Sequence, residues 1–574
     1  MNGRGSYAKR SVGPNFNELS SDFCTLEHSG GPEKGPSRVS KVFSRESLTG
    51  TTALLVYLGI ADFVIHMLFA GNYGYFRDEL YYIVSGTQHL SLGYVDFPPL
   101  IAYIAALLGV ISNDSLVSIH IVPALAESAL VVMAGLIARE LGGGRRAQLL
   151  AAVSTFLTLV FLADGSLFTP DSLDQLWWSL LGYVVIRSVR RKEPKLWLYA
   201  GLVVGVGIFT KADMLFFAGA LLVSFLAIPS CRGYLKTKWV PLGALIAIAF
   251  ALPMLYWNLS NGWPMVHFYL EFRGDVGGGG PLSFFVNQVE EVTFLNLPIF
   301  LIGLYFYLKS DQGSGLRALG LSYIILYVAM TVANAKPYYL LPIYPMLFAG
   351  GALLIERSSV SKKGLLRWFG SRPYIAGLAV IAILLTPLVM PIFPPSTLMS
   401  TYGASTLSSS NGGVASGETG PLPQTLGDRL SWDTMVATLA QVYNGLPGSE
   451  KSQACIFTTD YGQASAVNFL GKSLGLPEAI SGHNSYYVWG PGKCTGQVLI
   501  TVGPSLSYFN GSFSDFQKNY VNTTLRSGFG SVTYLTTIKC DFCENNENNV
   551  PVYLCTNPTF TSVASVWPGV RHYD

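Results

Sequence analysis

Long apolar runs alternate with short polar loops over residues 49–392 of the chain. The runs begin near residues 51, 117, 147, 172, 196, 213, 239, 283, 317, 338 and 374. A helix needs about 20 mostly apolar residues to cross a bilayer, and somewhat fewer or more are tolerated. The pattern therefore predicts an all-α polytopic membrane domain with about eleven transmembrane helices.

Lys and Arg gather in alternate loops of this domain. Short cytoplasmic loops are enriched in positive charge, so these loops are predicted to be cytoplasmic. They are residues 139–146, 187–195, 231–238, 309–317 and 356–372. The short apolar stretch from Pro98 begins with two prolines and is interpreted as an interfacial or re-entrant helix. Counting it as a span would place every later basic loop outside.

The two ends of the chain have a different character. Residues 1–48 are rich in Gly, Ser and charge and have no apolar core of a signal peptide, which predicts a flexible cytoplasmic tail. Residues 393–424 form a Ser/Gly-rich linker. Residues 425–574 contain the strand-like runs ACIFTTD, QVLITVG, VTYLTTI and VPVYLC, with a helical pattern between the first two. This pattern of strands and helix predicts an extracytoplasmic α/β domain.

Composition narrows the function classes. Charged residues make up 12% of the chain, whereas soluble domains have about 25%. A single water-soluble enzyme is thereby excluded. Lys plus Arg (37) barely exceeds Asp plus Glu (34), and the surplus lies at membrane edges, so nucleic acid is not an expected partner.

Five of the seven cysteines lie in the predicted extracytoplasmic domain: Cys455, Cys494, Cys540, Cys543 and Cys555. One or two disulfides are expected in an oxidising compartment, with the pairing left open. The CDFC sequence is a weak zinc signal, because no second pair follows at zinc spacing.

Two adjacent carboxylates, Asp78 and Glu79, follow the first apolar run on the predicted outer side. A carboxylate there can act as a general base on an incoming hydroxyl, which makes both residues candidate catalytic groups. Neighbouring side chains on a helix point about 100° apart, so one job for both is not expected. The alternative is a solvated loop or a salt bridge with Arg77.

Other predicted outer loops bring further polar side chains to the same membrane surface. The candidate substrate-binding residues are Asp96, Asp171, Lys211, Lys336, Tyr338 and Tyr339. Two lysines beside an outer cavity suit a phosphate-bearing lipid. As alternatives, each charge could snorkel or cap a helix, and Asp171 follows Pro170 as a capping residue does.

The long outer segment that ends in four glycines adds His267 and Arg273 as candidate substrate contacts. Mobile outer loops often close over substrates, although an ordinary polar loop explains the same residues. His267 and Glu271 are four apart, but two ligands do not make a metal site. The sequence predicts no certain cofactor and no metal ligands, and leaves a divalent metal open.

Several motifs in order resemble one family. RDELYYI after the first span, YVDFPPL, RELGGGRRAQ, FTPDSLDQLWW, FTKAD and KPYYLLPIYP are similar to bacterial dolichyl-phosphate-mannose-protein mannosyltransferase-like proteins. This is glycosyltransferase family 39 in its broad sense, which includes the lipid A aminoarabinose transferases. The resemblance runs from about residue 50 to 390. The later segment TTDYGQASAVNFLGKSLGLPEAISGHNSYYVWGPG resembles the C-terminal domain of one bacterial branch.

The resemblance implies a C-type glycosyltransferase of the bacterial inner membrane. It would move a sugar from a polyprenyl-phosphate donor, with inversion, to an extracytoplasmic lipid, glycan or protein. The family's base falls on Asp78, with Glu79 completing the acidic pair. Its phosphate contacts fall on Lys336 and Tyr339, with Lys211 as a second cation and Asp171 in support. The luminal MIR domain of the eukaryotic protein mannosyltransferases is absent, so nothing here favours a protein acceptor.

Two other readings stay open. A transporter or flippase of a lipid-linked or small solute also fits many spans with ionisable groups, although those groups lie on one side and no internal repeat is seen. A receptor or scaffold would use the C-terminal domain for binding. In that domain, the stretch SGHNSYYVWGP is either a set of sugar contacts or a packed turn.

Overall fold

The computed structural model describes residues 49–271, 280–360, 364–403 and 420–573. Residues Thr51–Asp574 form one compact unit, and the predicted tail of residues 1–48 lies outside the described residues. The predicted domain boundaries at residues 392 and 424 stay predictions.

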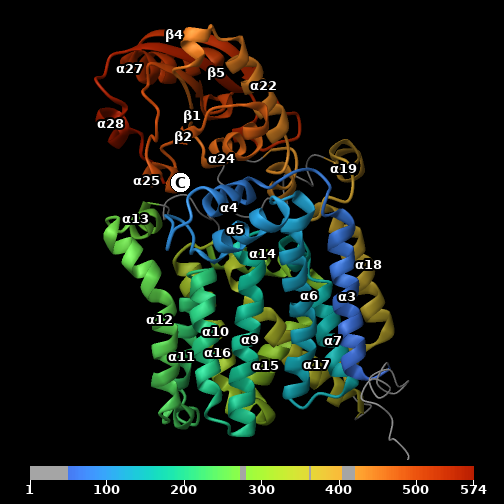
Figure 1. Cartoon of the computed structure of the whole chain (residues 1–574). Helices are drawn as coiled ribbons and strands as arrows, with labels where there is room; N and C mark the ends of the chain where they lie inside the picture. The colour runs from blue at the N-terminus through green and yellow to red at the C-terminus, as the bar shows by residue number, and fades with distance from the viewer. Residues whose placement is uncertain (1–48, 272–279, 361–363, 404–419, 574) are drawn as a thin grey trace, which may run out of the picture. The chain divides into compact units, whose positions relative to one another are not determined.

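The first part of this unit is helical (Figure 1). Its α-helices are α3 (Thr51–Phe69), α4 (Arg77–Thr87), α5 (Leu100–Ser112), α6 (Leu116–Glu140), α7 (Arg145–Phe156), α8 (Leu159–Asp164), α9 (Pro170–Arg191), α10 (Leu196–Thr210), α11 (Met214–Ala227), α12 (Trp239–Ser260), α13 (Pro264–Glu271), α14 (Gly280–Glu291), α15 (Leu297–Lys309), α16 (Arg317–Val332), α17 (Tyr344–Val360), α18 (Arg372–Leu385) and α19 (Pro395–Tyr402). A 3₁₀ helix, η5 (Pro337–Ile343), precedes α17.

The helices begin within a few residues of the predicted apolar runs. Among the described residues, five helical segments are long and apolar enough to cross a membrane, and a sixth is possible if α14 and α15 form one span bent by 100°. Shorter apolar helices include α5, α10, α11 and α18. The protein is therefore an integral membrane protein, while the number eleven stays a prediction. α5 has 13 residues and covers about 20 Å at 1.5 Å per residue, too short for an upright span.

The loops sort to opposite ends of the bundle. Helix α9 carries Asp171 in its first turn and Arg190 and Arg191 in its last, and 22 residues separate these ends by about 33 Å. At the basic end, Arg191 Nε lies 2.6 Å from Glu140 Oε1. The backbone N–H of Gly144 donates to Glu356 there at 2.7 Å. Three of the predicted cytoplasmic loops thus meet at one end.

The backbones of α10 and α12 approach each other closely where the two helices cross. A Cβ atom on Gly201 would overlap the backbone carbonyl of Gly243, so only glycine fits at this crossing. Small residues let helices in a membrane approach closely and gain van der Waals contact, because apolar burial provides little drive in lipid.

The C-terminal residues form the predicted α/β domain around one sheet. Its strands are β1 (Ala454–Thr458), β2 (Ala479–Ser481), β3 (Val498–Val502), β4 (Phe529–Ile538) and β5 (Val550–Pro558), in the order β2-β1-β3-β5-β4. The β1 strand is parallel to β2 and β3, whereas β5 is antiparallel to β3 and β4. The helices are α21 (Gln424–Gly427), α22 (Trp432–Gly445), α23 (Gly448–Lys451), α24 (Tyr461–Leu470), α25 (Asn484–Trp489), α26 (Phe513–Phe516), α27 (Arg526–Gly528) and α28 (Val563–Val566).

Two disulfides hold this domain. Cys455 bonds to Cys494, and Cys540 to Cys543. The two cysteines of CDFC are therefore joined in a disulfide and are not zinc ligands. Cys555 is a buried free thiol in β5.

Helix α24 begins at a capping carboxylate that provides a stability test. Asp460 Oδ1 accepts hydrogen bonds from the backbone N–H of Gly462 at 2.6 Å and of Gln463 at 3.3 Å. We expect Asp460→Ala to lower the free energy of unfolding by about 1 kcal/mol, the usual value of such a cap. The apparent melting temperature of the full chain in detergent measures this loss, with the exposed Asp515→Ala as control.

The same carboxylate sets a pH dependence. Burial opposes its charge, but the hydrogen bond and charge of His483 and the charge of Arg77 outweigh burial and lower the pKa of Asp460 to about 2. A depressed pKa stabilises the fold above the ordinary value of about 4, and this contribution is lost as pH falls towards 2. An Asp460→Ala melting temperature equal to that of the wild type at neutral pH would contradict the assignment.

Candidate functional site

Asp78 lies in the first turn of α4 and is the more accessible of the two adjacent carboxylates. Its side chain is 29% exposed, with Oδ1 3.8 Å from Arg77 Nε. The hydroxyl of Tyr461, at the start of α24, donates to the same Oδ1 at 2.6 Å. One carboxylate oxygen is thus held by the C-terminal domain, and the group still reaches solvent.

Glu79 has a different environment, because it is fully buried. Its Oε1 accepts from His120 Nε2 at 2.9 Å and from the backbone N–H of Phe168 at 2.7 Å, and its Oε2 accepts from the N–H of Phe76 at 2.9 Å. Burial opposes the charge, but His120 and these bonds outweigh it and lower the pKa of Glu79. This carboxylate ties α4 to α6 and to the loop before α9.

Asp96 lies close to the same loops and binds the C-terminal domain as well. Its Oδ1 accepts from the Tyr81 hydroxyl at 2.9 Å and its Oδ2 from Asn484 Nδ2 at 3.2 Å. Burial raises the pKa of Asp96 to about 7, with Asp78 adding to the shift. A carboxyl group that titrates near neutrality is suited to proton transfer.

Lys211 lies at the centre of an ion cluster, in the turn between α10 and α11. Its Nζ is 2.5 Å from Asp171 Oδ1 and 2.9 Å from Asp213 Oδ2. It also lies 4.5 Å from the ring centroid of Tyr339 and 5.5 Å from that of Tyr338. Burial opposes its charge, but the carboxylates outweigh burial and raise the pKa of Lys211 well above its usual value. Four predicted site residues are thus brought together.

Lys336 precedes η5, and its surroundings shift its pKa in the opposite direction to that of Lys211. Burial lowers its pKa, and the positive charges of Arg77 and Lys211 act in the same direction against the carboxylates of Asp78 and Asp171. These interactions place Lys336 in one electrostatic neighbourhood with Asp78 and the Lys211 cluster. Its ammonium group is a donor that can form charge-assisted hydrogen bonds with a phosphate.

Of the two candidates from the outer segment, only His267 lies among the described residues, and no contact with this cluster is seen for it. His267 is exposed on α13, and Arg273 lies outside the described residues. Glu271, the last residue of α13, has its Oε1 3.4 Å from Nη2 of Arg571. In the part of the chain that the structure describes, no group of three or more His, Cys, Asp or Glu side chains is placed to hold a metal ion.

The site includes residues that the sequence interpretation missed. Arg429 is almost fully buried, and its Nη2 donates to the carbonyl and hydroxyl oxygens of Ser166, each at 2.8 Å. It therefore joins the segment between α21 and α22 to the loop before α9. An Asp-Arg pair in the otherwise apolar LGDRLSW is the only sequence signal for it.

The SGHNSYYVWGP stretch is a packed turn for most of its length. His483, Asn484 and Tyr486 are 5%, 2% and 3% exposed. Trp489 stacks on His89 of the loop after α4, with ring centroids 4.1 Å apart. The structure therefore favours the packed-turn alternative over sugar contacts.

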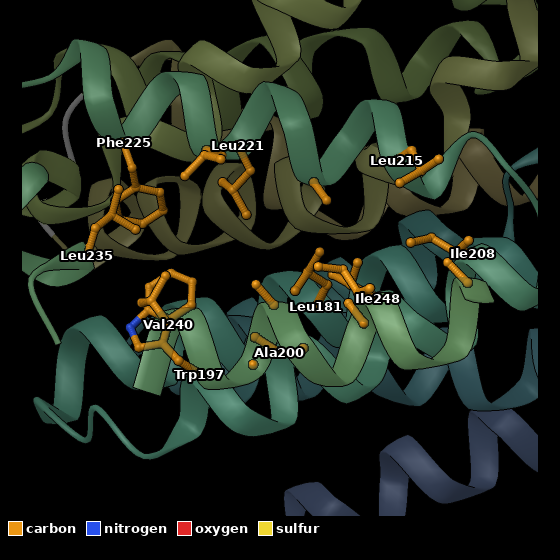
Figure 2. Close-up of a pocket in the computed structure, with 18 residues that line it drawn as sticks. Leu181, Trp197, Ala200, Ile208, Leu215, Leu221, Phe225, Leu235, Val240 and Ile248 are labelled. Atoms are coloured by element: carbon orange, nitrogen blue, oxygen red, sulfur yellow. The ribbon is translucent and has the colours of Figure 1, made fainter. Parts of the chain in front are cut away.

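An apolar groove runs between α10, α11 and α12, and Leu181 of α9 also lines it (Figure 2). It encloses about 300 Å³ and is lined by 18 residues, almost all of them apolar. Ile208 and Leu215 line one end, as Figure 2 shows. They lie three residues before Lys211 and two after Asp213, so this end of the groove is next to the ion cluster.

Comparison with known proteins places these features in one class. The family model for dolichyl-phosphate-mannose-protein mannosyltransferase matches residues 96–257. The resemblance to glycosyltransferase family 39 predicted from the sequence is thereby confirmed. The matched region contains Asp96, Asp171 and Lys211.

A particular relative is the lipid A galacturonosyltransferase RgtD of Rhizobium johnstonii. It is 28% identical over 214 residues, which are 37% of this chain and 44% of RgtD. The match thus spans less than half the length of this curated relative.

The fold is that of ArnT from Cupriavidus metallidurans. The apo structure aligns over 88% of this chain and 98% of ArnT, with a TM-score of 0.56 at 14% identity. The structure of ArnT bound to undecaprenyl phosphate gives a TM-score of 0.55 over the same shares. At this identity the likeness shows the fold alone.

Proposed function

We propose that the protein is an integral-membrane glycosyltransferase of the C type. It moves a hexosyl or pentosyl group from a polyprenyl-phosphate donor to an extracytoplasmic acceptor, with inversion. The observation that carries the proposal is the placement of Asp78, a partly exposed carboxylate, in one electrostatic neighbourhood with the partly buried cation Lys336. A base beside an anion-binding cation is what a single displacement from a phosphate requires.

The proposed reaction has one step. Asp78 takes the proton of the acceptor hydroxyl, whose oxygen attacks the anomeric carbon. The bond from that carbon to the phosphate oxygen breaks, and the polyprenyl phosphate leaves with the electron pair. One displacement inverts the anomeric centre.

Lys336 is proposed as the main contact of the leaving phosphate, with Lys211 and Tyr339 in support. The charge of Lys211 is already balanced by Asp171 and Asp213. Lys336 is the cation whose pKa burial lowers, so a phosphate there gains a charge-assisted hydrogen bond. Asp171 is then a positioning residue for Lys211.

The apolar groove is proposed to hold part of the donor's isoprenoid tail. Its lining is almost entirely apolar, so an isoprenoid chain can lie along it without contacting water. The RgtD and ArnT relatives support this choice of donor, since one structure of ArnT contains undecaprenyl phosphate.

The C-terminal domain is proposed to lie on the extracytoplasmic side of a bacterial inner membrane. Its two disulfides support this placement, because disulfides persist in oxidising compartments. The basic loops that meet at the other end of the bundle support it too.

The test is release of polyprenyl phosphate by the purified protein from a panel of polyprenyl-phosphate sugars with short and long chains. Candidate acceptors are lipid A, glycan and peptide. Release with covalent transfer to one acceptor supports the proposal, and a lower KM for long chains supports the tail groove. Movement of a lipid-linked solute across vesicles without any covalent product would favour the transporter instead.

Lys336→Ala is expected to raise the donor KM by about tenfold or more, since a hydrogen bond to a charged group contributes about 1.5–3 kcal/mol. The measurement is initial rate against donor concentration. Lys472→Ala, an exposed lysine of the C-terminal domain, is the matched control. An unchanged KM for the Lys336 variant would remove this residue from the phosphate site.

A further inference from the structure

Two side chains of the C-terminal domain reach carboxylates of the membrane loops. Tyr461 donates to Asp78, 383 positions earlier in the chain, and Asn484 donates to Asp96, 388 positions earlier. In a third contact the backbone N–H of Ser485 donates to the Tyr81 hydroxyl at 3.0 Å. The sheet domain is therefore bonded to the candidate base itself.

Tyr461 is fixed from several sides. It is 8% exposed, and its backbone N–H donates to His483 Nδ1 at 3.3 Å. Its ring lies 4.7 Å from that of Tyr81 between centroids, and the Arg77 guanidinium lies 5.5 Å from its ring centroid. A ring held in this way presents its hydroxyl at one position.

The next residue shows how closely the two parts fit. A Cβ atom on Gly462 would overlap Cγ of Arg77. The start of α24 can approach the first turn of α4 this closely because residue 462 is glycine. The hydrogen bond from Tyr461 thus belongs to a tight contact.

The bond has a chemical consequence for Asp78. A partly exposed aspartate can rotate, and a base acts only when its oxygen lies within reach of the acceptor proton. Tyr461 occupies Oδ1, which leaves Oδ2 as the oxygen available to take a proton. Burial raises the pKa of Tyr461 well above its usual value, so its hydroxyl keeps its proton and donates at all working pH values.

We propose that Tyr461 is a positioning residue for Asp78, so that the C-terminal domain completes the transferase centre. This inference rests on the proposed function of Asp78 as the base. It assigns the domain a direct part in turnover, in addition to any part in acceptor choice.

The test compares the full-length wild type with Tyr461→Phe, which removes only the hydroxyl and keeps the ring beside Arg77. We expect kcat for sugar transfer to fall by about tenfold to a hundredfold, the range of a hydrogen bond to a charged group. The donor KM should stay within about twofold, because Tyr461 is not proposed to touch the donor phosphate. The apparent melting temperature is measured in parallel.

The matched control is Tyr553→Phe, another buried tyrosine of the same domain, whose hydroxyl bonds Gln517. It should keep the wild-type kcat. A Tyr461→Phe enzyme with wild-type kcat would overturn the inference and leave the proposed function standing. A fall in kcat accompanied by a comparable rise in KM and a lower melting temperature would also overturn it, because that result indicates a structural role only. A wild type that turns over no donor would overturn the proposed function, and the inference with it.

Discussion

Asp78→Asn is expected to lower kcat for sugar transfer by about a hundredfold to ten-thousandfold, the usual contribution of a general base. Asparagine has nearly the same shape, and its amide oxygen can still accept the hydrogen bond that Tyr461 donates to Asp78 at 2.6 Å. The variant should therefore fold normally and bind donor normally, but it cannot take the acceptor proton. Release of polyprenyl phosphate under saturating donor measures the loss.

The control for this experiment is Asp433→Asn, an exposed carboxylate of α22, which should keep full activity. Donor binding by the Asp78 variant, measured separately, distinguishes a lost base from a lost site. Wild-type turnover by a well-folded Asp78→Asn protein would contradict the proposed mechanism.

Glu79→Ala, at the next residue, is expected to reduce the stability of the protein and not the chemical step alone. Its carboxylate is fully buried and accepts three hydrogen bonds, from His120, Phe168 and Phe76. Removing it leaves the donors of His120, Phe168 and Phe76 buried without an acceptor, and each buried group left unpaired costs about 1–3 kcal/mol. The variant should be strongly destabilised, as measured by the apparent melting temperature in detergent.

The exposed Glu290→Ala is the matched control and should melt like the wild type. A Glu79→Ala protein that is as stable as the wild type but inactive would show that Glu79 takes part in catalysis directly. That result would restore the paired-carboxylate interpretation. The expected result assigns the base to Asp78 and the positioning of its loop to Glu79.

The membrane helices follow from the sequence because their apolar runs are long and continuous. The runs that begin at residues 51, 196, 239 and 317 coincide with the starts of α3, α10, α12 and α16. Whether a helix crosses the bilayer depends on length, tilt and breaks, which composition does not encode. The 100° bend between α14 and α15 is such a break, in a region read as one run.

The C-terminal sheet was predicted where strands are long enough to show their pattern. β1 and β3 lie within two of the predicted runs, and β4 and β5 contain the other two. β2, with three residues, is too short to produce a period. The parallel and antiparallel pairing was not predicted, since it depends on contacts between distant segments.

The site was predictable in its components but not in its connections. Lys211, Asp171, Tyr338 and Tyr339 were predicted as outer-loop residues, and the structure brings them together. The bonds from Tyr461 and Asn484 were missed, because no local pattern joins residues 383 or 388 positions apart. The different roles of Asp78 and Glu79 depend on burial, which adjacent letters do not reveal.

The distance along the chain between Asp78 and Tyr461 also bears on biosynthesis. A ribosome makes Asp78 383 residues before it makes Tyr461, so the membrane helices are inserted long before the side chain that positions the base exists. On the proposed role of Tyr461, a nascent or prematurely terminated copy carries the lysines and the groove but transfers little sugar. Full activity begins only when the last domain has been translated and folded, and incomplete copies consume little of the lipid-linked donor.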